Sequence, residues 1–240
     1  MLRALVWDVD GTLAETEHHG HRIAFNQAFA DEGLDWHWDE ALYRDLLATT
    51  GGKERLLRWW QQRDPAAAAA PQAAARIAQL HARKTVIYVD LVARGVVQLR
   101  PGVARLLQAA RADGLVLAIA TTTSPDNVLA LLQATLGADS PGWFACIAAG
   151  DVVPAKKPAA DIYHWVLQRL GLVAGDCLAL EDSAPGCAAA LAAGLPTVVT
   201  RSRYTLHDQL PASPLLRADL ADLAAVDLAQ LRAWHAAAAA

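Results

Sequence analysis

Residues 1–13 read MLRALVWDVDGTL, a short apolar run that ends abruptly in the acids Asp8 and Asp10. An apolar run of this length, bounded by turn residues, indicates a buried strand of a parallel sheet. The pattern recurs over residues 115–120, 146–149, 177–180 and 197–200. Helical segments with capping residues are expected between these runs, over residues 124–137, 158–171 and 183–194. The alternation predicts an α/β fold, a parallel sheet covered by helices on both faces.

The alternation stops between about Ala14 and Arg94, where helical patterns follow one another without a strand. The expected helices cover residues 17–32, 39–49, 53–62 and 72–92, and the alanine-rich stretch 64–71 is either a poorly defined connection or a helix start. A chain of 240 residues is long for one average domain and short for two. We therefore expect one core, residues 1–14 and 95–240, with an all-helical cap inserted as residues 15–94.

The composition excludes several classes of protein. The net charge is −4 and no cluster of Lys and Arg stands out, so a nucleic-acid partner is not expected. Three irregularly spaced cysteines suit neither a disulfide framework nor a zinc site. No apolar run reaches the ~18 residues of a membrane helix, and the first residues lack the pattern of a signal peptide. These features favour a cytoplasmic protein with no membrane partner. The final alanines, residues 236–240, are expected to be frayed.

Four polar clusters follow the predicted strands, and in a parallel sheet such positions meet at one edge. They are Asp8 with Asp10, Thr121 to Thr123, Lys156 with Lys157, and Glu181 with Asp182. Each cluster alone has an ordinary structural interpretation as a turn, a helix start or a helix cap. Gathered carboxylates, however, repel one another unless a cation lies between them. The four together predict a site for a hard metal bound through oxygen, for which Mg²⁺ is the expected ion.

The same clusters supply the parts that phosphoryl transfer needs. One carboxylate can attack phosphorus and form an aspartyl-phosphate. A second carboxylate, two residues away, can protonate the leaving alkoxide and then activate water. Thr121 and Lys157 can offer a hydroxyl donor and a positive charge to the phosphoryl group, with Lys156 competing for the role of Lys157.

The segment Asp8-Val9-Asp10-Gly11-Thr12-Leu13 resembles the first motif of the haloacid dehalogenase superfamily. Thr121 stands at the second motif of that family, Lys157-Pro158 at the third, and Glu181-Asp182 at the fourth. The resemblance implies a Rossmann-like core with Asp8 as nucleophile and Asp10 as general acid and base. It favours Lys157 over Lys156, because Lys157 directly precedes the proline.

The resemblance also implies a ligand set for the metal. Asp8 and Asp182 would bind it through carboxylates and Asp10 through its main-chain carbonyl. Glu181 would be a further ligand or a hydrogen-bonding neighbour of the ligands.

The expected cap contains a glycine turn that opens a helix, Thr50-Gly51-Gly52-Lys53-Glu54-Arg55. Free N–H groups at a helix start suit an anion, and Lys53 and Arg55 add positive charge. This turn could bind a second phosphate of the substrate, although an ordinary turn before a solvated helix explains the same pattern.

Resemblance extends to the cap, through Ala14 to Glu17, Trp36 to Trp38 and the glycine turn, and to core residues 120–123 and 150–163. These stretches are similar to those of the CbbY-type phosphatases, which share their architecture with β-phosphoglucomutase. The resemblance implies a set of substrate contacts: Glu17, Tyr43, Gly51, Gly52, Lys53, Arg55, Thr122 and Thr123.

The function implied is a Mg²⁺-dependent phosphatase that acts on a small sugar phosphate. The best-known CbbY-type members convert xylulose-1,5-bisphosphate, an inhibitor of Rubisco, to xylulose-5-phosphate. Three alternatives stay open: a β-phosphoglucomutase-like sugar phosphomutase, a broad sugar-phosphate phosphatase, and a non-catalytic interaction protein. A monomer is expected.

Overall fold

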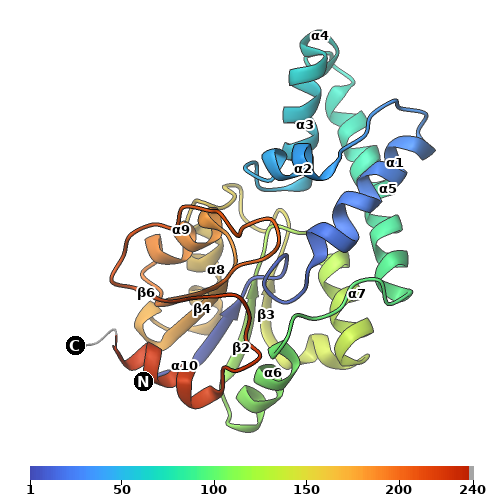
Figure 1. Cartoon of the computed structure of the whole chain (residues 1–240). Helices are drawn as coiled ribbons and strands as arrows, with labels where there is room; N and C mark the ends of the chain where they lie inside the picture. The colour runs from blue at the N-terminus through green and yellow to red at the C-terminus, as the bar shows by residue number, and fades with distance from the viewer. Residues whose placement is uncertain (238–240) are drawn as a thin grey trace.

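The computed structural model describes residues 1–237 and has a six-stranded sheet at its centre (Figure 1). All neighbouring strands are parallel, in the order β3-β2-β1-β4-β5-β6. The strands are β1 (Ala4–Trp7), β2 (Val116–Ala120), β3 (Phe144–Ala148), β4 (Cys177–Glu181), β5 (Thr197–Thr200) and β6 (Leu216–Leu220). This sheet confirms the predicted α/β fold. Because β1 lies in the interior of the sheet, Asp8, directly after it, lies centrally at the carboxyl edge.

Successive side chains of each strand point to opposite faces of the sheet. Because both sets are apolar, helices cover both faces. In β1, Leu5 and Trp7 pack into one apolar cluster, whereas Ala4 and Val6 pack into another. The first cluster is covered by α6 (Val103–Ala112), α7 (Pro125–Leu136) and α10 (Leu228–Ala236). The second is covered by α8 (Asp161–Leu170) and α9 (Ala184–Ala192). Two short 3₁₀ segments, η2 (Ser140–Trp143) and η3 (Ala174–Asp176), precede β3 and β4.

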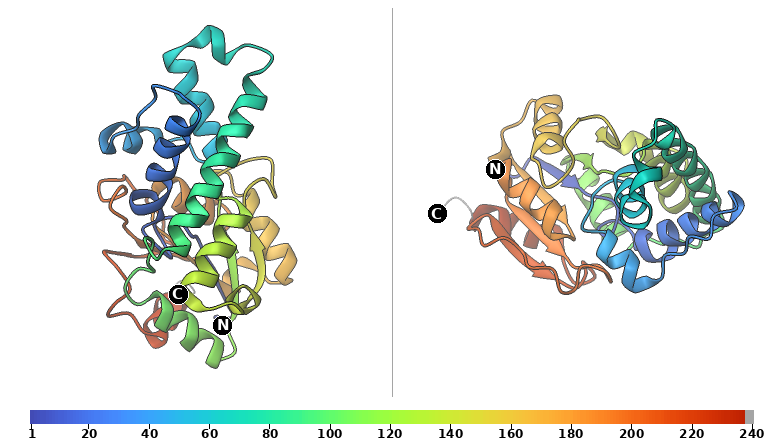
Figure 2. Two further views of the ribbon diagram at one scale, coloured as in Figure 1. Left: turned by 90° about the vertical axis from the view of Figure 1, so that its right-hand side faces the viewer. Right: turned by 90° about the horizontal axis from the view of Figure 1, so that it is seen from above.

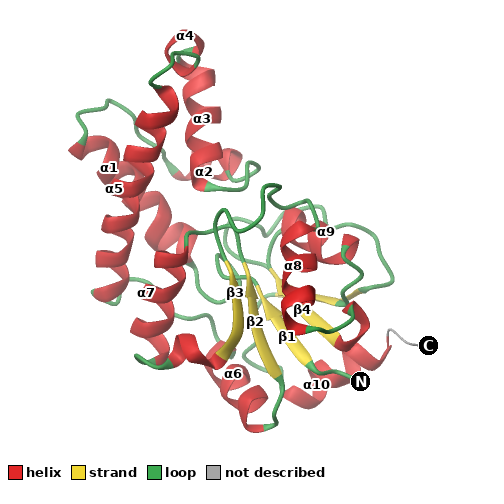
Figure 3. Cartoon of the chain, turned by 180° about the vertical axis from the view of Figure 1, so that it is seen from behind, coloured by secondary structure: helices red, strands yellow, loops and turns green. Residues whose placement is uncertain are grey.

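A second group of helices stands beyond the carboxyl ends of the strands (Figures 1 and 3). It comprises the π-helical turn η1 (Glu17–His21), α1 (Arg22–Asp31), α2 (Glu40–Leu46), α3 (Gly52–Arg63), α4 (Pro65–Ala68) and α5 (Ala73–Ala93). Its core is aromatic, and the ring of buried Trp38 lies within 6.5 Å of the rings of Phe25, Phe29, Tyr43 and Trp59. The long helix α5 also runs beside α7 of the sheet layer (Figure 2).

The chain passes between the two groups at two adjacent points. Ala14 pairs with Leu99 in an antiparallel bridge, and the main-chain nitrogen of Arg100 donates to the Leu13 carbonyl at 2.8 Å. On this basis we propose residues 15–94 as a cap and the remainder as the core.

The expected elements agree with the structure within a few residues, with some differences. The helix expected from residue 17 begins as a π-helical turn, and the helix expected from residue 158 begins at Asp161. The strand β6 and the helices α6 and α10 were not predicted. β6 reads LRADL, and the charges of Arg217 and Asp219 break the apolar run because an edge strand is only partly covered.

The terminal alanines and the expected lack of a membrane helix can also be compared with the structure. Of the alanines expected to be frayed, Ala236 ends α10, and residues 238–240 lie outside the described part. Within residues 1–237, no helix is both long enough and apolar enough to cross a membrane.

Candidate active site

Asp8 lies in a buried charge cluster at the carboxyl end of β1. The ammonium group of Lys157 donates to Asp8 Oδ1 at 2.7 Å, to Glu181 Oε1 at 2.6 Å and to the Ala120 carbonyl at 2.9 Å. The Tyr163 hydroxyl donates to the same oxygen of Glu181. Burial would lower the pKa of Lys157, but Asp8 and Glu181 raise it above its ordinary value. The structure therefore places a fixed positive charge against Asp8.

Asp182 completes an acidic cluster with Asp8 and Glu181. Each of these buried residues offers a carboxylate oxygen, and the three oxygens lie within 4.8 Å of one another. Burial raises the pKa of Asp8 to about 7 despite the opposing charge of Lys157, and burial together with Asp8 raises the pKa of Asp182. Glu181 Oε2 has no hydrogen-bond partner among the described residues. One ammonium does not balance three carboxylates, so this cluster could hold a hard divalent cation.

Two glycines leave room for these carboxylates. A Cβ atom on Gly11 would lie 2.0 Å from Asp182 Oδ2, and one on Gly186 would lie 2.0 Å from Glu181 Oε2. Gly11 also has a φ of 86°, a backbone conformation that L side chains rarely adopt. A side chain at either position would push an acid out of the cluster.

Asp10 is bound by residues from the proposed cap. Its Oδ1 accepts a hydrogen bond from Thr16 Oγ1 at 2.6 Å and lies 2.9 Å from His21 Nε2. The other ring nitrogen of His21 lies 2.7 Å from the Lys84 ammonium group. Burial alone would raise the pKa of Asp10, but His21 and Thr16 lower it to about 2. Burial lowers the pKa of Lys84 to about 8, against the opposing charge of Asp10.

Neither Thr16 and His21, which contact Asp10, nor Lys84, which contacts His21, was among the predicted catalytic, metal-binding or substrate-binding residues. His21 and Lys84 are 63 residues apart in sequence, and only the packing of the cap brings them together. The orientation of Asp10 therefore depends on the position of the cap.

The three threonines after β2 have different surroundings. Thr121 is buried, and its hydroxyl accepts a hydrogen bond from the main-chain nitrogen of Thr123 at 3.3 Å. The Thr123 hydroxyl accepts one from Asn127 Nδ2 at 2.9 Å. Thr122 instead lines an open cleft. Hydrogen bonds within the turn and from α7 thus hold Thr121 and Thr123, whereas Thr122 lines the cleft.

Three of the expected substrate contacts form a separate buried group in the cap. The Tyr43 hydroxyl donates to Glu17, and Arg55 Nη1 donates to the Tyr43 oxygen at 2.9 Å. Arg55 Nη2 lies 3.6 Å from Glu17 Oε1. Burial raises the pKa of Tyr43, and Glu17 adds to the shift. In this structure the charge of Arg55 is therefore balanced by Glu17.

Lys53 connects the cap to the core. Its ammonium group lies 2.6 Å from Asp151 Oδ2, and the Lys156 ammonium group lies 2.8 Å from Asp151 Oδ1. Hydrogen bonds from Lys156 and Lys53 lower the pKa of Asp151 to about 2. Lys156 therefore binds Asp151, whereas Lys157 binds Asp8.

A cleft of about 470 Å³ opens between the cap and the core at this point. Four of the expected substrate contacts line it: Gly51, Gly52, Lys53 and Thr122. On the cap side the Thr50 hydroxyl donates to the main-chain carbonyl of Lys157, which joins the glycine turn to the charge cluster.

The chain is similar in sequence and fold to known proteins of one family. A model of the haloacid dehalogenase-like hydrolase family matches residues 2–194. Protein CbbY (plasmid) of Cupriavidus necator is 50% identical over 247 residues, which cover 98% of this chain and 97% of that protein. CbbY from Rhodobacter sphaeroides, in a crystal structure with phosphate, is 45% identical in sequence to this chain. The two structures superpose with a TM-score of 0.88, over 97% of this chain and 100% of that chain. A mutant of the same protein in complex with xylulose-1,5-bisphosphate is 44% identical in sequence, with a TM-score of 0.88. The likeness covers 96% of this chain and 99% of that chain. The likeness therefore includes the cap helices as well as the sheet.

Proposed function

The chain belongs to the haloacid dehalogenase-like hydrolases and is a phosphatase, and from this premise we propose that it converts xylulose-1,5-bisphosphate to xylulose-5-phosphate. The observation that carries the proposal is the position of Asp8. It lies at the carboxyl end of an interior strand, 2.7 Å from the Lys157 ammonium group and within the acidic cluster. A buried carboxylate beside a fixed positive charge is suited to attack phosphorus.

We assign Mg²⁺ to the acidic cluster. Asp8 and Asp182 would bind it through their carboxylates and Asp10 through its main-chain carbonyl, with Glu181 as a further ligand or a neighbour. The donor set fits, because its carboxylate oxygens lie within 4.8 Å of one another and Glu181 Oε2 has no hydrogen-bond partner among the described residues. When bound, the ion would neutralise charge on the phosphoryl group and favour the ionised form of Asp8.

Asp8 and Asp10 would divide the chemistry. A carboxylate oxygen of Asp8 bonds to phosphorus while the bond from phosphorus to the sugar oxygen breaks, and that oxygen takes a proton from Asp10. Water then attacks the aspartyl-phosphate, Asp10 accepts its proton, and inorganic phosphate leaves. With its pKa at about 2, Asp10 is ionised at neutral pH but is a weak base, so accepting a proton from water requires that this pKa rise. Donation in the first step requires that substrate binding raise this pKa.

The cap supports the choice of a bisphosphate. Lys53 and Lys156 both bind Asp151, and all three line the cleft, whereas Asp8 is not among the residues that line it. A second phosphate could replace Asp151 as the partner of Lys53. The Rhodobacter sphaeroides relative in complex with xylulose-1,5-bisphosphate supports the same substrate.

Phosphate release tests the proposed reaction. With Mg²⁺ and no bisphosphate primer, the protein is expected to release one inorganic phosphate from each xylulose-1,5-bisphosphate. Chelation of the metal should abolish turnover, and added Mg²⁺ should restore it. The kcat/KM for the bisphosphate should exceed that for xylulose-5-phosphate by roughly a hundredfold, because the single phosphate of xylulose-5-phosphate cannot occupy the Asp8 site and the Lys53 site at once. Similar values for many sugar phosphates would indicate a broad phosphatase, and isomerisation of a sugar phosphate without phosphate release would contradict hydrolysis.

Lys53→Ala tests the second phosphate site. The KM for xylulose-1,5-bisphosphate is expected to rise roughly tenfold, because a charged hydrogen bond to that phosphate is lost. The KM for a sugar monophosphate should change less than twofold. Steady-state phosphate release measures both values. Arg63→Ala, at the other end of α3 with 41% of its side chain exposed, serves as the matched control. An equal rise for both substrates would remove the second-phosphate role of Lys53.

The cytoplasmic location and the monomeric state stay predictions from the sequence.

A further inference from the structure

The segment after β5 makes a tight turn against the acidic cluster. In this 202–205 turn, the main-chain nitrogen of Thr205 donates to the Ser202 carbonyl at 3.1 Å. The Thr205 hydroxyl lies 3.4 Å from Asp182 Oδ2 and accepts a hydrogen bond from the Ser202 main-chain nitrogen at 2.9 Å. Both side chains are buried. Thr205 therefore contacts the carboxylate proposed as a metal ligand.

The neighbouring residue of the same turn, Tyr204, packs into the cap although it belongs to the core. Only 6% of Tyr204 is exposed, and it lies in the aromatic cluster of the cap. Its ring centroid lies 5.7 Å from that of Tyr43 and 5.9 Å from that of His18, and its hydroxyl lies 3.4 Å from His18 Nδ1. Tyr43 in turn bonds to Glu17 and Arg55. Tyr204 thus touches the group of cap residues expected to contact substrate.

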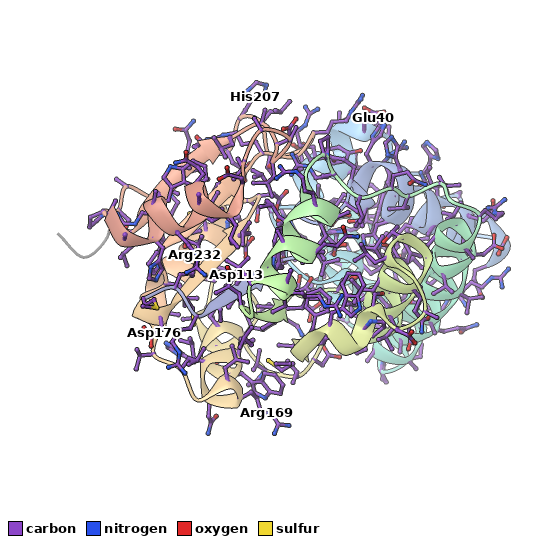
Figure 4. All side chains as sticks on the ribbon, turned by 90° about the horizontal axis from the view of Figure 1, so that it is seen from below. Glu40, Asp113, Arg169, Asp176, His207 and Arg232 are labelled. Carbon is purple, nitrogen blue, oxygen red and sulfur yellow. The ribbon has the colours of Figure 1, made fainter. Side chains whose placement is uncertain are left out.

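A second contact at the turn also joins core and cap. Arg203 Nη2 lies 3.1 Å from Glu40 Oε2 at the start of α2. Figure 4 shows Glu40 and His207, three residues beyond Tyr204, along the same edge of the molecule.

The turn is braced from within the core. Arg201 Nη1 donates to the main-chain carbonyls of Thr205 at 3.0 Å, Leu206 at 3.2 Å and Asp208 at 3.0 Å. The rest of its guanidinium group binds Asp219 of β6 through two contacts of 2.7 and 2.9 Å. Because Arg201 holds the Thr205 carbonyl and the Thr205 nitrogen bonds to the Ser202 carbonyl, the turn is expected to move as a unit, so that a shift at Thr205 also shifts Tyr204.

We infer that Tyr204 is a positioning residue that couples the cap to the metal site through the 202–205 turn. The cap docks on the Tyr204 ring, and the next residue, Thr205, orients Asp182. Docking of the cap therefore favours the orientation of Asp182 that binds the cation, and binding of the cation favours the docked cap. This inference rests on the proposed function, since it concerns the geometry of the same site.

Tyr204→Ala tests the coupling. If the fraction of docked cap falls, the KM for xylulose-1,5-bisphosphate is expected to rise roughly tenfold, with kcat reduced less than threefold. Coupling also predicts that Mg²⁺ binds the substrate-free variant roughly fivefold more weakly, although Tyr204 does not touch Asp182. Isothermal titration calorimetry with Mg²⁺ alone measures this affinity. Tyr204→Phe keeps the ring and should stay within about twofold of wild type in every value.

Leu206→Ala is the matched control, because Leu206 lies one residue beyond the 202–205 turn with 52% of its surface exposed. Circular dichroism establishes that each variant folds, and Tyr204→Leu replaces Tyr204→Ala if the alanine variant does not. If wild type binds Mg²⁺ and the variant without the ring matches its Mg²⁺ affinity, the inference is wrong, even if the KM rises. Equal damage from phenylalanine and alanine would also overturn it, because the ring is then not the docking element. If wild type binds no Mg²⁺, the proposed metal site fails and the coupling with it.

Discussion

Asp8→Asn is expected to lower kcat for xylulose-1,5-bisphosphate on the order of 10⁴-fold or more, because the amide cannot form the aspartyl-phosphate. The fold should survive. Burial and acidic neighbours already raise the pKa of Asp8 to about 7, so a neutral side chain of the same size suits the site. Without metal, the thermal midpoint at pH 8 should equal or exceed that of wild type. Phosphate release measures the activity, and circular dichroism measures the midpoint.

Asp139→Asn is the control for this substitution, because Asp139 is an exposed carboxylate outside the cluster. It should leave kcat within about twofold of wild type, as is usual for surface changes. A folded Asp8→Asn variant that keeps most of its activity toward every phosphate ester tested would show that Asp8 is not the nucleophile.

Asp10→Asn is expected to lower kcat by roughly 10²- to 10⁴-fold, the usual contribution of a general acid and base. The two half-reactions should respond differently. With p-nitrophenyl phosphate the leaving group needs no proton, so Asp8 should still be phosphorylated, while hydrolysis of the aspartyl-phosphate should slow. Intact-protein mass spectrometry should therefore detect an accumulated phosphoenzyme. If the variant is as slow as predicted but no phosphoenzyme forms from this substrate, Asp10 does not act as the base of the second step.

The structure explains which parts of this site could be predicted from the sequence. Asp8, Lys157 and Asp182 follow strands or their loops, and the carboxyl ends of parallel strands meet at one edge whatever the rest of the chain does. Short-range patterns were sufficient for them. These short-range patterns did not distinguish residues 156 and 157, because both are lysines. The structure distinguishes them, since Lys157 binds Asp8 and Lys156 binds Asp151.

The residues that could not be predicted act through long-range packing. His21 and Lys84 lie on different helices, and nothing local marks either as a partner of Asp10. Tyr204 follows β5 in an irregular segment, where a single aromatic residue has no periodic pattern around it. β6 was missed for a related reason, because an edge strand with alternating charges lacks the apolar run that revealed the other strands.

The antiparallel bridge between Ala14 and Leu99 means that the cap both begins and ends at one point of the core. Paired residues of this kind lie about 5 Å apart, a gap that a turn of a few residues can close. The inserted helices can therefore be regarded as an exchangeable module. Replacement of residues 15–94 by another cap would preserve Asp8, Lys157 and Asp182, but would change what surrounds the sugar and remove the cap partners of Asp10. Such an architecture allows substrate choice to diverge while the phosphoryl chemistry is inherited unchanged.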